Sequence, residues 1–532
     1  MNFSISETQL RNLISGYMKV KEDDVQDIYQ IRKGMTNQSY HFCVDNREYL
    51  LRIPGKGTQK IIDRRKEAEI VAQLQDLDIC DEVVVIDPES GILIKAYYPD
   101  SRTADDHNRE DLALCMQKLK QLHRLHLTSS FRFELFEEIK RYEELTGVSE
   151  FPKEMQLLRE KIFSFQPFIE AHTYTRCLCH IDAVKDNFLL HDGKVHLIDW
   201  EYAGDADPHL DLAMFSVYSN YSPKELNQLI SLYMEGPFPE YIAAKIYGYA
   251  SACALLWYYW CIIREKSGVR FDEYKRQEYD YAFRFAQYAE QKISSLTRHT
   301  VQQAIILAAG KGERLFPLTE QTPKPLLSVC GKPMIESIID ALHYNGIKEI
   351  YIVTGYKKEC FAYLKKDPGI HLIENPYYAS ANNISSLYVV RGHLEDTVIL
   401  DGDQVIFDTS VCSASFEGSG YRCVWTDKPT KEWVLDVNDC GAVQACHRNG
   451  ADHGWQLYSI SYWTKEDGRK LAECVQKKFE EEQNSQLYWD DLALFCYPHR
   501  FQLCVYPMLP DSMKEIDTLE EYERFCYGSE LA

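Results

Sequence analysis

The feature that most constrains how this chain can fold is residues 302–334, where a short apolar run ends in a glycine-rich loop. The run 304–309 has the length of a buried strand, and Gly310 and Gly312 break it. A glycine loop at the carboxyl end of a parallel strand lets backbone N–H groups approach phosphates, because no Cβ atom stands in the way. We therefore expect an α/β domain that begins near residue 302 and holds phosphate at Leu307, Ala308, Ala309, Gly310 and Gly312.

Three basic residues follow in the same stretch, and prolines stiffen the chain between them. Lys311, Arg314 and Lys324 would lie where the charge of a triphosphate is expected, although an ordinary strand-to-helix turn is the alternative. The string LAAGKGERLFPLTEQTPKPLL, with Gly-Lys-Pro at 331–333, resembles the signature of nucleoside-triphosphate transferases that act on sugar phosphates and alcohol phosphates. The resemblance implies that the loop binds a nucleotide and that the three basic residues are catalytic.

At 532 residues the chain is too long for one compact core, so we expect two domains, at 1–296 and 302–532. The formal net charge of −22 argues against a nucleic-acid or anionic-membrane partner. The 17 cysteines are scattered and lack zinc-site spacing, which favours reduced thiols in the cytoplasm. The first residues, MNFSISETQL, lack the pattern of a signal peptide, and this also favours a cytoplasmic location.

The stretch 246–263 contains no charged residue and just reaches the length of a membrane-spanning helix. Its tyrosines and tryptophans lie in the middle rather than at the two ends, and Gly248, Ser251 and several hydroxyl groups would need polar partners in lipid. We therefore expect a helix buried in a protein core, and no membrane partner.

The amino-terminal part predicts a β-hairpin with a turn of small residues. Strands are expected at 29–32 and 39–44, around a turn that contains Gly34, Thr36 and Asn37. Kinases fold such a hairpin over nucleotide phosphates, although the pattern alone fits any hairpin. If the kinase interpretation holds, the three turn residues bind nucleotide.

The segment 177–201, CLCHIDAVKDNFLLHDGKVHLIDWE, holds the most specific motif of the first domain. His180, Asp182 and Asn187 form the pattern HxDxxxxN, and a strand-turn-strand then leads to Asp199. Kinase-type phosphoryl transfer needs one aspartate that accepts the proton of the attacking hydroxyl, plus an asparagine and a second aspartate that hold Mg²⁺. A surface turn with incidental acidic residues is the alternative, but every required group occurs in order. We expect Asp182 to be the catalytic base and Asn187 and Asp199 to be metal ligands.

This arrangement resembles the aminoglycoside-phosphotransferase and choline-kinase branch of the kinase fold, over roughly residues 20–290. Within that branch, LLRIPG at 50–55, IDWEYAG at 198–204, DP at 207–208 and DLA at 211–213 resemble bacterial choline kinases. Those enzymes feed the phosphocholine decoration of surface glycans. The resemblance implies ATP as the phosphate donor, choline as the acceptor and Mg²⁺ as the cofactor.

Arg52, in a strand predicted at 49–53, stands where most kinases have a lysine that contacts the α- and β-phosphates. Choline kinases have arginine there, so Arg52 supports the narrower family. Its acidic partner is expected on a helix from about 60 to 77. The family pattern favours Glu67, with Glu69 as the rival.

Trp257 and Trp260 lie one helical turn apart and share a face, with Tyr258 and Tyr259 beside them. Aromatic faces attract quaternary ammonium groups, although an aromatic stripe is more often part of a core. The WxxW spacing resembles the choline-pocket helix of choline kinases. We therefore expect Trp257 and Trp260, together with Glu201, to bind choline.

After the glycine-rich loop, helices and strands alternate as in a doubly wound parallel sheet. Helices are expected at 335–345 and 358–365, and strands at 349–354, 371–374 and 397–400.

The last of these strands leads into Asp401-Gly402-Asp403. In the transferases that the loop resembles, a carboxylate at this place holds Mg²⁺, and Asp403 is the family position; Asp401 is the expected acceptor of a turn hydrogen bond. Asp517 resembles the second metal-binding carboxylate, and its alternative role is an N-cap next to Thr518.

The middle of the second domain is rich in aromatic residues, most of which core packing explains. A subset that lines a pocket would suit a trimethylammonium group, and we expect Trp433, Tyr462 and Trp489 to belong to it. The segment LYWDD at 487–491 resembles phosphocholine cytidylyltransferases, and that resemblance covers roughly 302–528.

The two resemblances predict an α+β protein-kinase-like fold followed by an α/β Rossmann-like nucleotidyltransferase fold of the GT-A type. The chain would phosphorylate choline with ATP and then transfer a cytidylyl group from CTP, giving CDP-choline and pyrophosphate, with Mg²⁺ in both domains. Two alternatives stay open. One is a kinase for another amino-alcohol or a sugar, fused to a sugar-1-phosphate nucleotidyltransferase; the other is a non-catalytic kinase-like module on a cytidylyltransferase. The sequence does not distinguish choline from ethanolamine or CTP from UTP, and it is compatible with a homo-oligomer.

Overall fold

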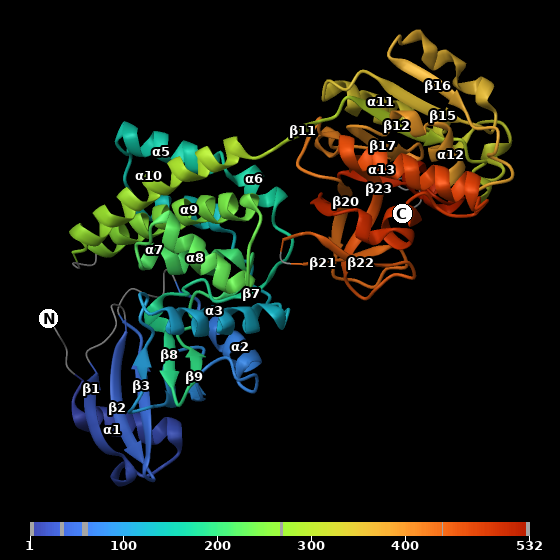
Figure 1. Cartoon of the computed structure of the whole chain (residues 1–532). Helices are drawn as coiled ribbons and strands as arrows, with labels where there is room; N and C mark the ends of the chain where they lie inside the picture. The colour runs from blue at the N-terminus through green and yellow to red at the C-terminus, as the bar shows by residue number, and fades with distance from the viewer. Residues whose placement is uncertain (1–4, 32–36, 56–61, 267–269, 439, 528–532) are drawn as a thin grey trace. The chain divides into compact units, whose positions relative to one another are not determined.

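The computed structural model describes residues 5–31, 37–55, 62–266, 270–438 and 440–527. The chain divides into two compact units, Met1–Ser295 (unit 1) and Leu296–Ala532 (unit 2), which follow each other along the colour bar of Figure 1. Each unit has its own sheet, helices and core.

Unit 1 begins with a five-stranded antiparallel sheet that is covered by helix α1 (Glu7–Met18). Tyr40, Phe42 and Val44 share one face of the sheet, because side chains alternate along a strand. They form an apolar core with Leu10 and Ile14 of α1. In spatial order the strands are β1 (Gln26–Ile31), β2 (Gln38–Val44), β3 (Arg47–Ile53), β5 (Leu93–Ala96) and β4 (Val83–Ile86).

Helix α2 (Arg64–Leu74) is shorter than the helix expected from about 60 to 77. Asp63 ends the preceding loop, and its carboxylate accepts hydrogen bonds from the backbone N–H groups of Arg65 (3.0 Å) and Lys66 (3.4 Å). An aspartate N-cap satisfies N–H groups that have no partner inside the helix, and it therefore sets the first turn.

The rest of unit 1 is mainly helical and is built around α9. Its helices are α3 (Arg109–Arg124), α4 (Leu135–Thr146), α5 (Lys153–Phe163), α6 (Gln166–Ala171), α7 (His209–Tyr218), α8 (Pro223–Met234), α9 (Glu240–Glu265) and α10 (Asp272–Ser295). Its short strands are β6 (Arg102–Thr103), β7 (Cys177–Cys179), β8 (Phe188–His191), β9 (Lys194–Leu197) and β10 (Gly204–Ala206). By length and composition α9 could cross a membrane, but 78% of its apolar stretch is buried in the protein. Contacts with α4, α7 and α10 cover it, in agreement with the buried helix expected at 246–263.

Helix α9 carries a buried ion pair with the segment after β10. Lys245 Nζ lies 2.7 Å from Asp207 Oδ2, and the two side chains are 1% and 4% exposed. The same ammonium group donates to the carbonyl oxygen of His172 at 2.7 Å, and Asp207 also accepts from the hydroxyl of Tyr249 at 3.2 Å. Burial alone would raise the pKa of Asp207, but Lys245 and His209 bring it down to about 2. The carboxylate is therefore charged at neutral pH in a site that excludes water.

We expect the substitution Lys245→Met to destabilise unit 1 by about 3–5 kcal/mol, because it leaves the carboxylate of Asp207 buried without its cation. Urea unfolding followed by circular dichroism measures the change. Lys140→Met is the matched control, since Lys140 is 45% exposed and its pair with Glu137 lies on the surface of α4, where ion pairs contribute little. A loss below about 1 kcal/mol for Lys245→Met would contradict the prediction.

Unit 2 is built on a mixed sheet. Strands β16, β15, β12 and β17 are parallel, whereas β23 runs antiparallel to both β17 and β20. The expected parallel arrangement is therefore correct for these four strands and for the pair formed by β20 and β24, which β23 separates from them. In the described residues, the chain between β17 and β23 forms strands and turns rather than a crossover helix, so it returns antiparallel. In spatial order the strands are β16 (Ile370–Glu374), β15 (Ile350–Thr354), β12 (Gln303–Ala308), β17 (Thr397–Asp401), β23 (Gly454–Trp463), β20 (Gly420–Thr426) and β24 (Cys504–Pro507).

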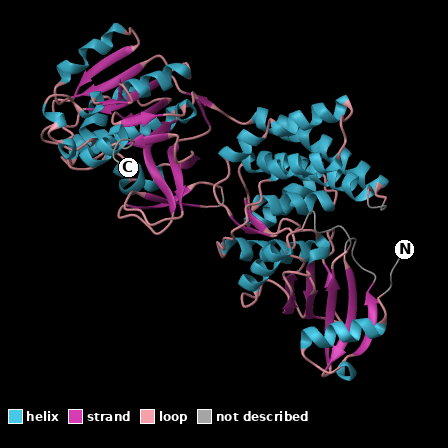
Figure 2. Ribbon diagram, turned by 180° about the vertical axis from the view of Figure 1, so that it is seen from behind, coloured by secondary structure: helices cyan, strands magenta, loops and turns pink. Residues whose placement is uncertain are grey.

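Helices flank the strands of unit 2, as Figure 2 shows. They are α11 (Met334–Tyr344), α12 (Ile384–Val389), α13 (Lys465–Gln476) and α14 (Leu519–Tyr527). Ile335 and Ile338 of α11 pack with Ala304 and Ile306 of β12 in the main core. The shorter strands form pairs: β11 (His299–Thr300) with β19 (Ser415–Phe416), β13 (Ser328–Val329) with β14 (Lys332–Pro333), β18 (Gln404–Ile406) with β25 (Met513–Glu515), and β21 (Val434–Val437) with β22 (Val443–His447).

The α-helix expected at 358–365 is a 3₁₀ helix, Lys358–Lys366. Its buried apolar residues, Phe361 and Leu364, are three positions apart. Side chains at this spacing lie directly above one another in a 3₁₀ helix, so both reach the core.

Candidate active sites

The loop between β7 and β8 is held in place by Asp211 of α7. The Asp211 carboxylate accepts hydrogen bonds from the backbone N–H groups of His180 (2.9 Å) and Ile181 (2.7 Å). Asp211 is fully buried, and His123 Nε2 of α3 lies 3.0 Å from its Oδ2. Ile181 has a φ of 67°, which is strained for a β-branched residue and persists only where the surroundings hold it. Contacts from two helices thus fix the loop that carries the HxDxxxxN motif.

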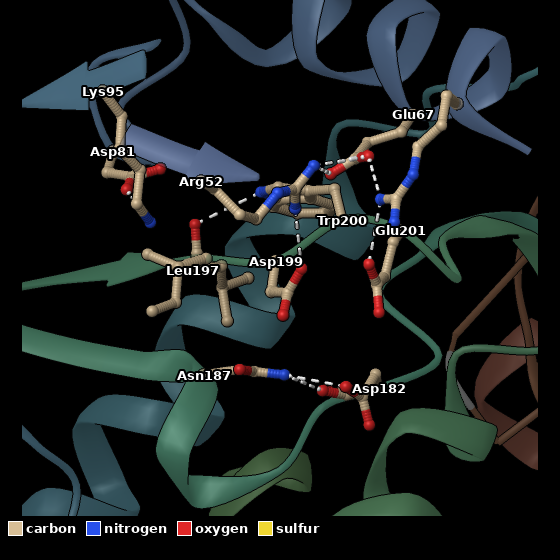
Figure 3. Close-up of polar contacts among 12 residues, drawn as sticks. Arg52, Glu67, Asp81, Lys95, Asp182, Asn187, Leu197, Asp199, Trp200 and Glu201 are labelled. Atoms are coloured by element: carbon tan, nitrogen blue, oxygen red, sulfur yellow. Dashed lines mark hydrogen bonds and ion pairs between the residues drawn. The ribbon is translucent and has the colours of Figure 1, made fainter. Parts of the chain in front are cut away.

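Asp182 and Asn187 are in contact within this loop (Figure 3). Asn187 Nδ2 donates to the carbonyl oxygen of Asp182 at 2.8 Å and to its Oδ2 at 3.0 Å. Burial, and then the charge of Asp199, raises the pKa of Asp182 to about 7 against the opposing hydrogen bond from Asn187. A carboxylate with a pKa near neutrality is suited to accept a proton from a hydroxyl group.

Arg52 of β3 forms two ion pairs across this site (Figure 3). Its Nη2 lies 2.6 Å from Oε1 of Glu67, and its Nη1 lies 3.1 Å from Oδ1 of Asp199. Glu69 instead accepts a hydrogen bond from Ser130 Oγ at 3.0 Å. Glu67 is therefore the partner of Arg52. Glu67 lies on the buried face of α2, whereas Glu69 points to Ser130 instead.

Two predicted metal ligands fit Mg²⁺ by the chemistry of their donor atoms. Asn187 offers an amide oxygen and Asp199 a carboxylate, and the Asp199 side chain is 33% exposed, so an ion can reach it. Of the predicted turn residues, Gly34 and Thr36 lie outside the described residues. Asn37 lies directly before β2, and its Oδ1 is buried with no hydrogen-bond partner among the described residues.

Glu201 follows Asp199 by two residues and is buried. Its Oε2 accepts a hydrogen bond from Nη1 of Arg64 at 3.0 Å. Burial, and then the charge of Asp199, raises the pKa of Glu201 to about 8 despite the arginines nearby. The ring of the next residue, Tyr202, lies 6.1 Å from the ring of Trp257, edge to face. Tyr202 thus connects the segment that carries Glu201 to an aromatic ring of α9.

The two tryptophans of the expected cage differ in exposure. Trp257 is partly exposed, whereas Trp260 is 3% exposed. Trp260 packs against Trp257 with ring centroids 5.6 Å apart and against Phe271 at 5.2 Å, and Arg264 lies 5.8 Å from its ring. Trp257 can therefore present a ring face to a cation. The buried Trp260 packs against Trp257 and holds its ring in position.

In unit 2 the glycine-rich loop packs tightly against the segment that carries Lys324. Gly312 has a φ of 64°, and a Cβ atom there would lie 2.9 Å from the Cβ atom of Lys324. Thr319 Oγ1 donates to the carbonyl oxygen of Gly312 at 3.0 Å. Around Gly310, by contrast, no described atom lies within 4 Å of an added Cβ atom, so this part of the loop is open. The preceding residues, Leu307, Ala308 and Ala309, are buried at the end of the strand.

Lys324 lies between the two carboxylates predicted to bind metal. Its Nζ is 2.8 Å from Oδ1 of Asp517 and is also paired with Asp403. Nη2 of Arg314 contacts the same oxygen of Asp517 at 2.9 Å. Lys311 is 45% exposed and takes no part in these ion pairs. The structure thus joins Lys324 to both carboxylates and Arg314 to Asp517.

The two carboxylates meet because β18 and β25 pair with each other. Asp403 comes directly before β18, and Asp517 follows shortly after β25. Helix α14 is capped by Thr518, whose Oγ1 accepts from the N–H of Glu521 at 3.2 Å. The alternative role of Asp517 as the N-cap is therefore wrong, since its carboxylate is engaged by Lys324 instead.

Three more carboxyl groups lie around this site, and sequence reasoning did not assign them to it. Burial, and then the charges of Asp403 and Asp401, raises the pKa of Glu515 to about 8. Burial raises the pKa of Asp490 to about 7, and that of Asp401 rises well above its usual value. The sequence held two signals that could have assigned these residues to the site. Glu515 precedes Asp517 by two residues, and Asp490 lies in the LYWDD segment.

The carboxyl groups of this site outnumber its basic groups. Like charges that share a buried site raise the free energy of one another, and a bound cation offsets that cost. Oxygen donors are the ligands that Mg²⁺ prefers, so Asp403 and Asp517 fit this ion.

Among the aromatic residues of unit 2, Trp433 lies close to the LYWDD segment. Its ring is 5.9 Å from that of Tyr488, which is 49% exposed. The guanidinium group of Arg448 lies 5.3 Å from the centre of the Trp433 ring and forms an ion pair with Asp491. Trp433 and Tyr488 therefore form an accessible aromatic surface beside the pair of Arg448 and Asp491.

Tyr462 and Trp489, which we expected to line this pocket, lie in the core instead. Tyr462 is fully buried and donates to the carbonyl oxygen of Val411 at 2.7 Å. Trp489 is 1% exposed and packs against Tyr421 and Trp463. The expectation is corrected for both, because Tyr462 belongs to the main core of unit 2 and Trp489 packs among buried aromatic rings.

Two family models match the chain, one in each unit. Residues 28–228 match "Choline/ethanolamine kinase", and residues 303–405 match "Nucleotidyl transferase". These ranges contain the catalytic loop of unit 1 and the glycine-rich loop with Asp403 of unit 2.

Curated relatives also match the two units separately. Unit 2 is 36% identical over 228 residues to the 2-aminoethylphosphonate cytidylyltransferase of Lancefieldella rimae. The aligned residues cover 42% of this chain and 92% of that relative. Unit 2 is 35% identical over 224 residues to the choline-phosphate cytidylyltransferase of Streptococcus pneumoniae, 42% of this chain and 96% of the relative. Unit 1 is 28% identical over 263 residues to Protein LicA of Haemophilus influenzae, 47% of this chain and 98% of the relative.

These matches confirm the expected fold class, a kinase-like fold followed by a nucleotidyltransferase fold. Unit 2 spans nearly the whole length of two cytidylyltransferases at more than 30% identity. The chain therefore belongs to the nucleotidyl transferase family through unit 2, and it carries in unit 1 a domain of the choline/ethanolamine kinase family.

Proposed function

We propose that this chain makes CDP-choline in two consecutive reactions, one in each unit. The observation that supports the proposal is that the residues predicted for both reactions are grouped in their own units on one chain. The product of the first proposed reaction is the substrate of the second. Asp182, Asn187 and Asp199 are all present and grouped in unit 1, and Lys324 joins Asp403 and Asp517 in unit 2.

In the first reaction, choline would attack the γ-phosphorus of ATP. Asp182 accepts the proton of the hydroxyl group, the new O–P bond forms, and the bond to ADP breaks. Arg52 would contact the α- and β-phosphates, held in place by Glu67. Asn187 and Asp199 would hold Mg²⁺, which when bound neutralises charge on the phosphates. Trp257 and Glu201 would face the trimethylammonium group.

In the second reaction, a phosphate oxygen of phosphocholine would attack the α-phosphorus of CTP. The new P–O–P bond forms and pyrophosphate leaves. A phosphate is already largely ionised at neutral pH, so no general base is required. Lys324 and Arg314 would stabilise the charge that develops, with the loop of Gly310 and Gly312 around the triphosphate. Asp403 and Asp517 would hold Mg²⁺, which when bound supplies further neutralisation.

One relative of unit 2 acts on 2-aminoethylphosphonate, as its name states, and this is the second candidate acceptor. That compound carries a primary ammonium group and a phosphonate. Phosphocholine is favoured here because a choline/ethanolamine kinase domain on the same chain produces a phosphate ester rather than a phosphonate. A role in the cytoplasm follows from substrates such as ATP and CTP, and phosphocholine decoration of surface glycans would consume the product.

Phosphorus NMR of the purified protein tests the proposal. With ATP, CTP, Mg²⁺ and choline we expect CDP-choline to form, and less product with ethanolamine. Parallel samples contain CTP with either phosphocholine or 2-aminoethylphosphonate. If 2-aminoethylphosphonate is converted faster than phosphocholine, it becomes the assigned acceptor of unit 2. If no phosphorylated amino-alcohol forms, the kinase assignment of unit 1 is overturned.

The rate of choline phosphorylation should fall as the pH is lowered through about 7. The pKa of Asp182 is raised to about 7, so the group is increasingly protonated below that pH and cannot accept a proton. Bound Mg²⁺ favours the ionised form and would move the midpoint to lower pH. A profile of kcat/KM against pH measures this, and a rate that does not change on the acidic side would contradict it.

Substituting Trp257 by alanine should raise the KM for choline roughly 10-fold, with a smaller change in the KM for ATP, because a desolvated cation–π contact contributes about 1–2 kcal/mol. Trp257→Phe is the matched control, since it keeps an aromatic face and should raise the KM less. Steady-state kinetics with each substrate varied in turn give both constants. Equal effects of the two substitutions would remove Trp257 from the choline site.

A further inference from the structure

A second buried arginine, Arg64, lies next to the predicted catalytic residues of unit 1. It is the first residue of α2. A single nitrogen of its side chain, Nη1, lies 2.9 Å from Oε2 of Glu67 and 3.0 Å from Oε2 of Glu201. The side chains of Arg64, Glu67 and Glu201 are 8%, 1% and 3% exposed. One guanidinium group therefore bridges two buried carboxyl groups from segments far apart in the sequence.

The fold leaves space for this side chain at one particular glycine. Gly91 lies in the turn between β4 and β5 with a φ of 71°, and a Cβ atom there would lie 2.8 Å from Cδ and 2.9 Å from Cγ of Arg64. Any other residue at this position would displace the stem of Arg64 or strain the turn. The position of the guanidinium group is thus set by the turn as well as by its two carboxyl partners.

The bridge completes a chain of alternating basic and acidic side chains across unit 1. Arg52 pairs with Glu67, Glu67 pairs with Arg64, and Arg64 pairs with Glu201. One end, Arg52, is the residue expected to contact the phosphates of ATP. The other end, Glu201, is followed in sequence by Tyr202, whose ring contacts that of Trp257, a residue expected to bind the acceptor.

We propose that Arg64 is a positioning residue that couples the nucleotide side of unit 1 to its acceptor side. The inference rests on the proposed function, because it takes the two ends of the chain to face the two substrates. In a buried network each polar group is held by its neighbours, so replacing one group changes the position and the pairing of the next. A change at Glu201 therefore reaches Arg52 through Arg64 and Glu67, in addition to the direct attraction between Arg52 and Glu201. The affinities for the two substrates then depend on each other.

A double-mutant cycle on nucleotide affinity tests this without reference to the identity of the acceptor. The dissociation constant of a non-hydrolysable ATP analogue with Mg²⁺ is measured by calorimetry for the unsubstituted chain, Glu201→Gln, Arg64→Met and the double variant. The direct electrostatic effect of Glu201 on the nucleotide is present both in the unsubstituted chain and in Arg64→Met. It therefore cancels when the effect of Glu201→Gln is compared between these two backgrounds. We expect the factor by which Glu201→Gln changes the dissociation constant to differ roughly threefold or more between the two backgrounds. A difference below about threefold would overturn the proposal.

Arg65→Met provides the matched control cycle. Arg65 is the next residue of α2, is 73% exposed and pairs with Glu89 on the surface. Its cycle with Glu201→Gln should show no interaction. If Arg64→Met does not fold, as judged by circular dichroism, Arg64→Gln takes its place, because a neutral amide removes the cation that bridges the two carboxyl groups.

The outcomes separate this inference from the proposed function. Formation of phosphocholine by the unsubstituted chain, together with additive effects in the cycle, would leave the kinase activity standing and remove the coupling role of Arg64. A clear interaction in the cycle without phosphorylation of choline would support the coupling and send the acceptor assignment back to other amino-alcohols.

Discussion

Replacing Asp182 by asparagine is expected to lower the rate of choline phosphorylation roughly 10²- to 10⁴-fold, the usual contribution of a positioned general base. The amide has nearly the same shape but cannot accept the proton of the attacking hydroxyl group. Asn187 Nδ2, which donates to Asp182 at 3.0 Å, can still donate to the amide oxygen of the variant, so the loop should keep its conformation.

The measurement is phosphocholine formation from choline and ATP, with CDP-choline formation from added phosphocholine and CTP as the internal control. The second reaction should be unchanged, because Asp182 belongs to unit 1. Asp186→Asn is the matched control in the same loop, since Asp186 is exposed and accepts a hydrogen bond from the hydroxyl of Tyr218. Unchanged phosphorylation in Asp182→Asn would favour the alternative in which the kinase-like unit is not catalytic.

Replacing Lys324 by methionine is expected to lower kcat of cytidylyl transfer roughly 10²- to 10³-fold, as for the loss of one electrostatic donor in other active sites. The buried ammonium group contacts both Asp403 and Asp517, so its removal also leaves two carboxylates facing each other. Burial alone would lower the pKa of Lys324, but these two carboxylates raise it, which keeps the group charged.

The rate of CDP-choline formation from phosphocholine and CTP measures this effect, and choline phosphorylation by the same protein serves as the control. Lys332→Met is the matched substitution, because Lys332 is 39% exposed and pairs with Asp340 on the surface of the same region. A loss below about tenfold in Lys324→Met would mean that Lys324 mainly offsets the acidic cluster and does not act on the transition state.

The structure brings predicted site residues together most directly where these residues lie close together in sequence. Asp182, Asn187 and Asp199 belong to one loop and hairpin, and the structure brings them together as the motif requires. In unit 2, the strand 304–309 and the glycines after it likewise form the expected strand and loop. Local spacing was enough here, because a tight turn leaves few conformations to the residues around it.

Sequence reasoning was less accurate for aromatic residues, since exposure depends on the face of each element that packs inward. Of the three aromatic residues expected in the pocket of unit 2, Trp433 lies near the exposed Tyr488, whereas Tyr462 and Trp489 are buried. Neighbouring positions such as 488 and 489 have opposite exposures, and composition carries no information on which of the two faces the solvent.

The sequence by itself determined the two-domain order, the fold class of each unit, the catalytic loop of unit 1 and the glycine-rich loop of unit 2. Only the tertiary structure decided which distant charges meet. Arg64 and Glu201 are 137 residues apart, and Lys324 and Asp517 are 193 residues apart. The physical reason is that a motif encodes local backbone geometry, whereas an ion pair between segments requires that packing bury both groups at one place and hold them within a few ångströms of each other.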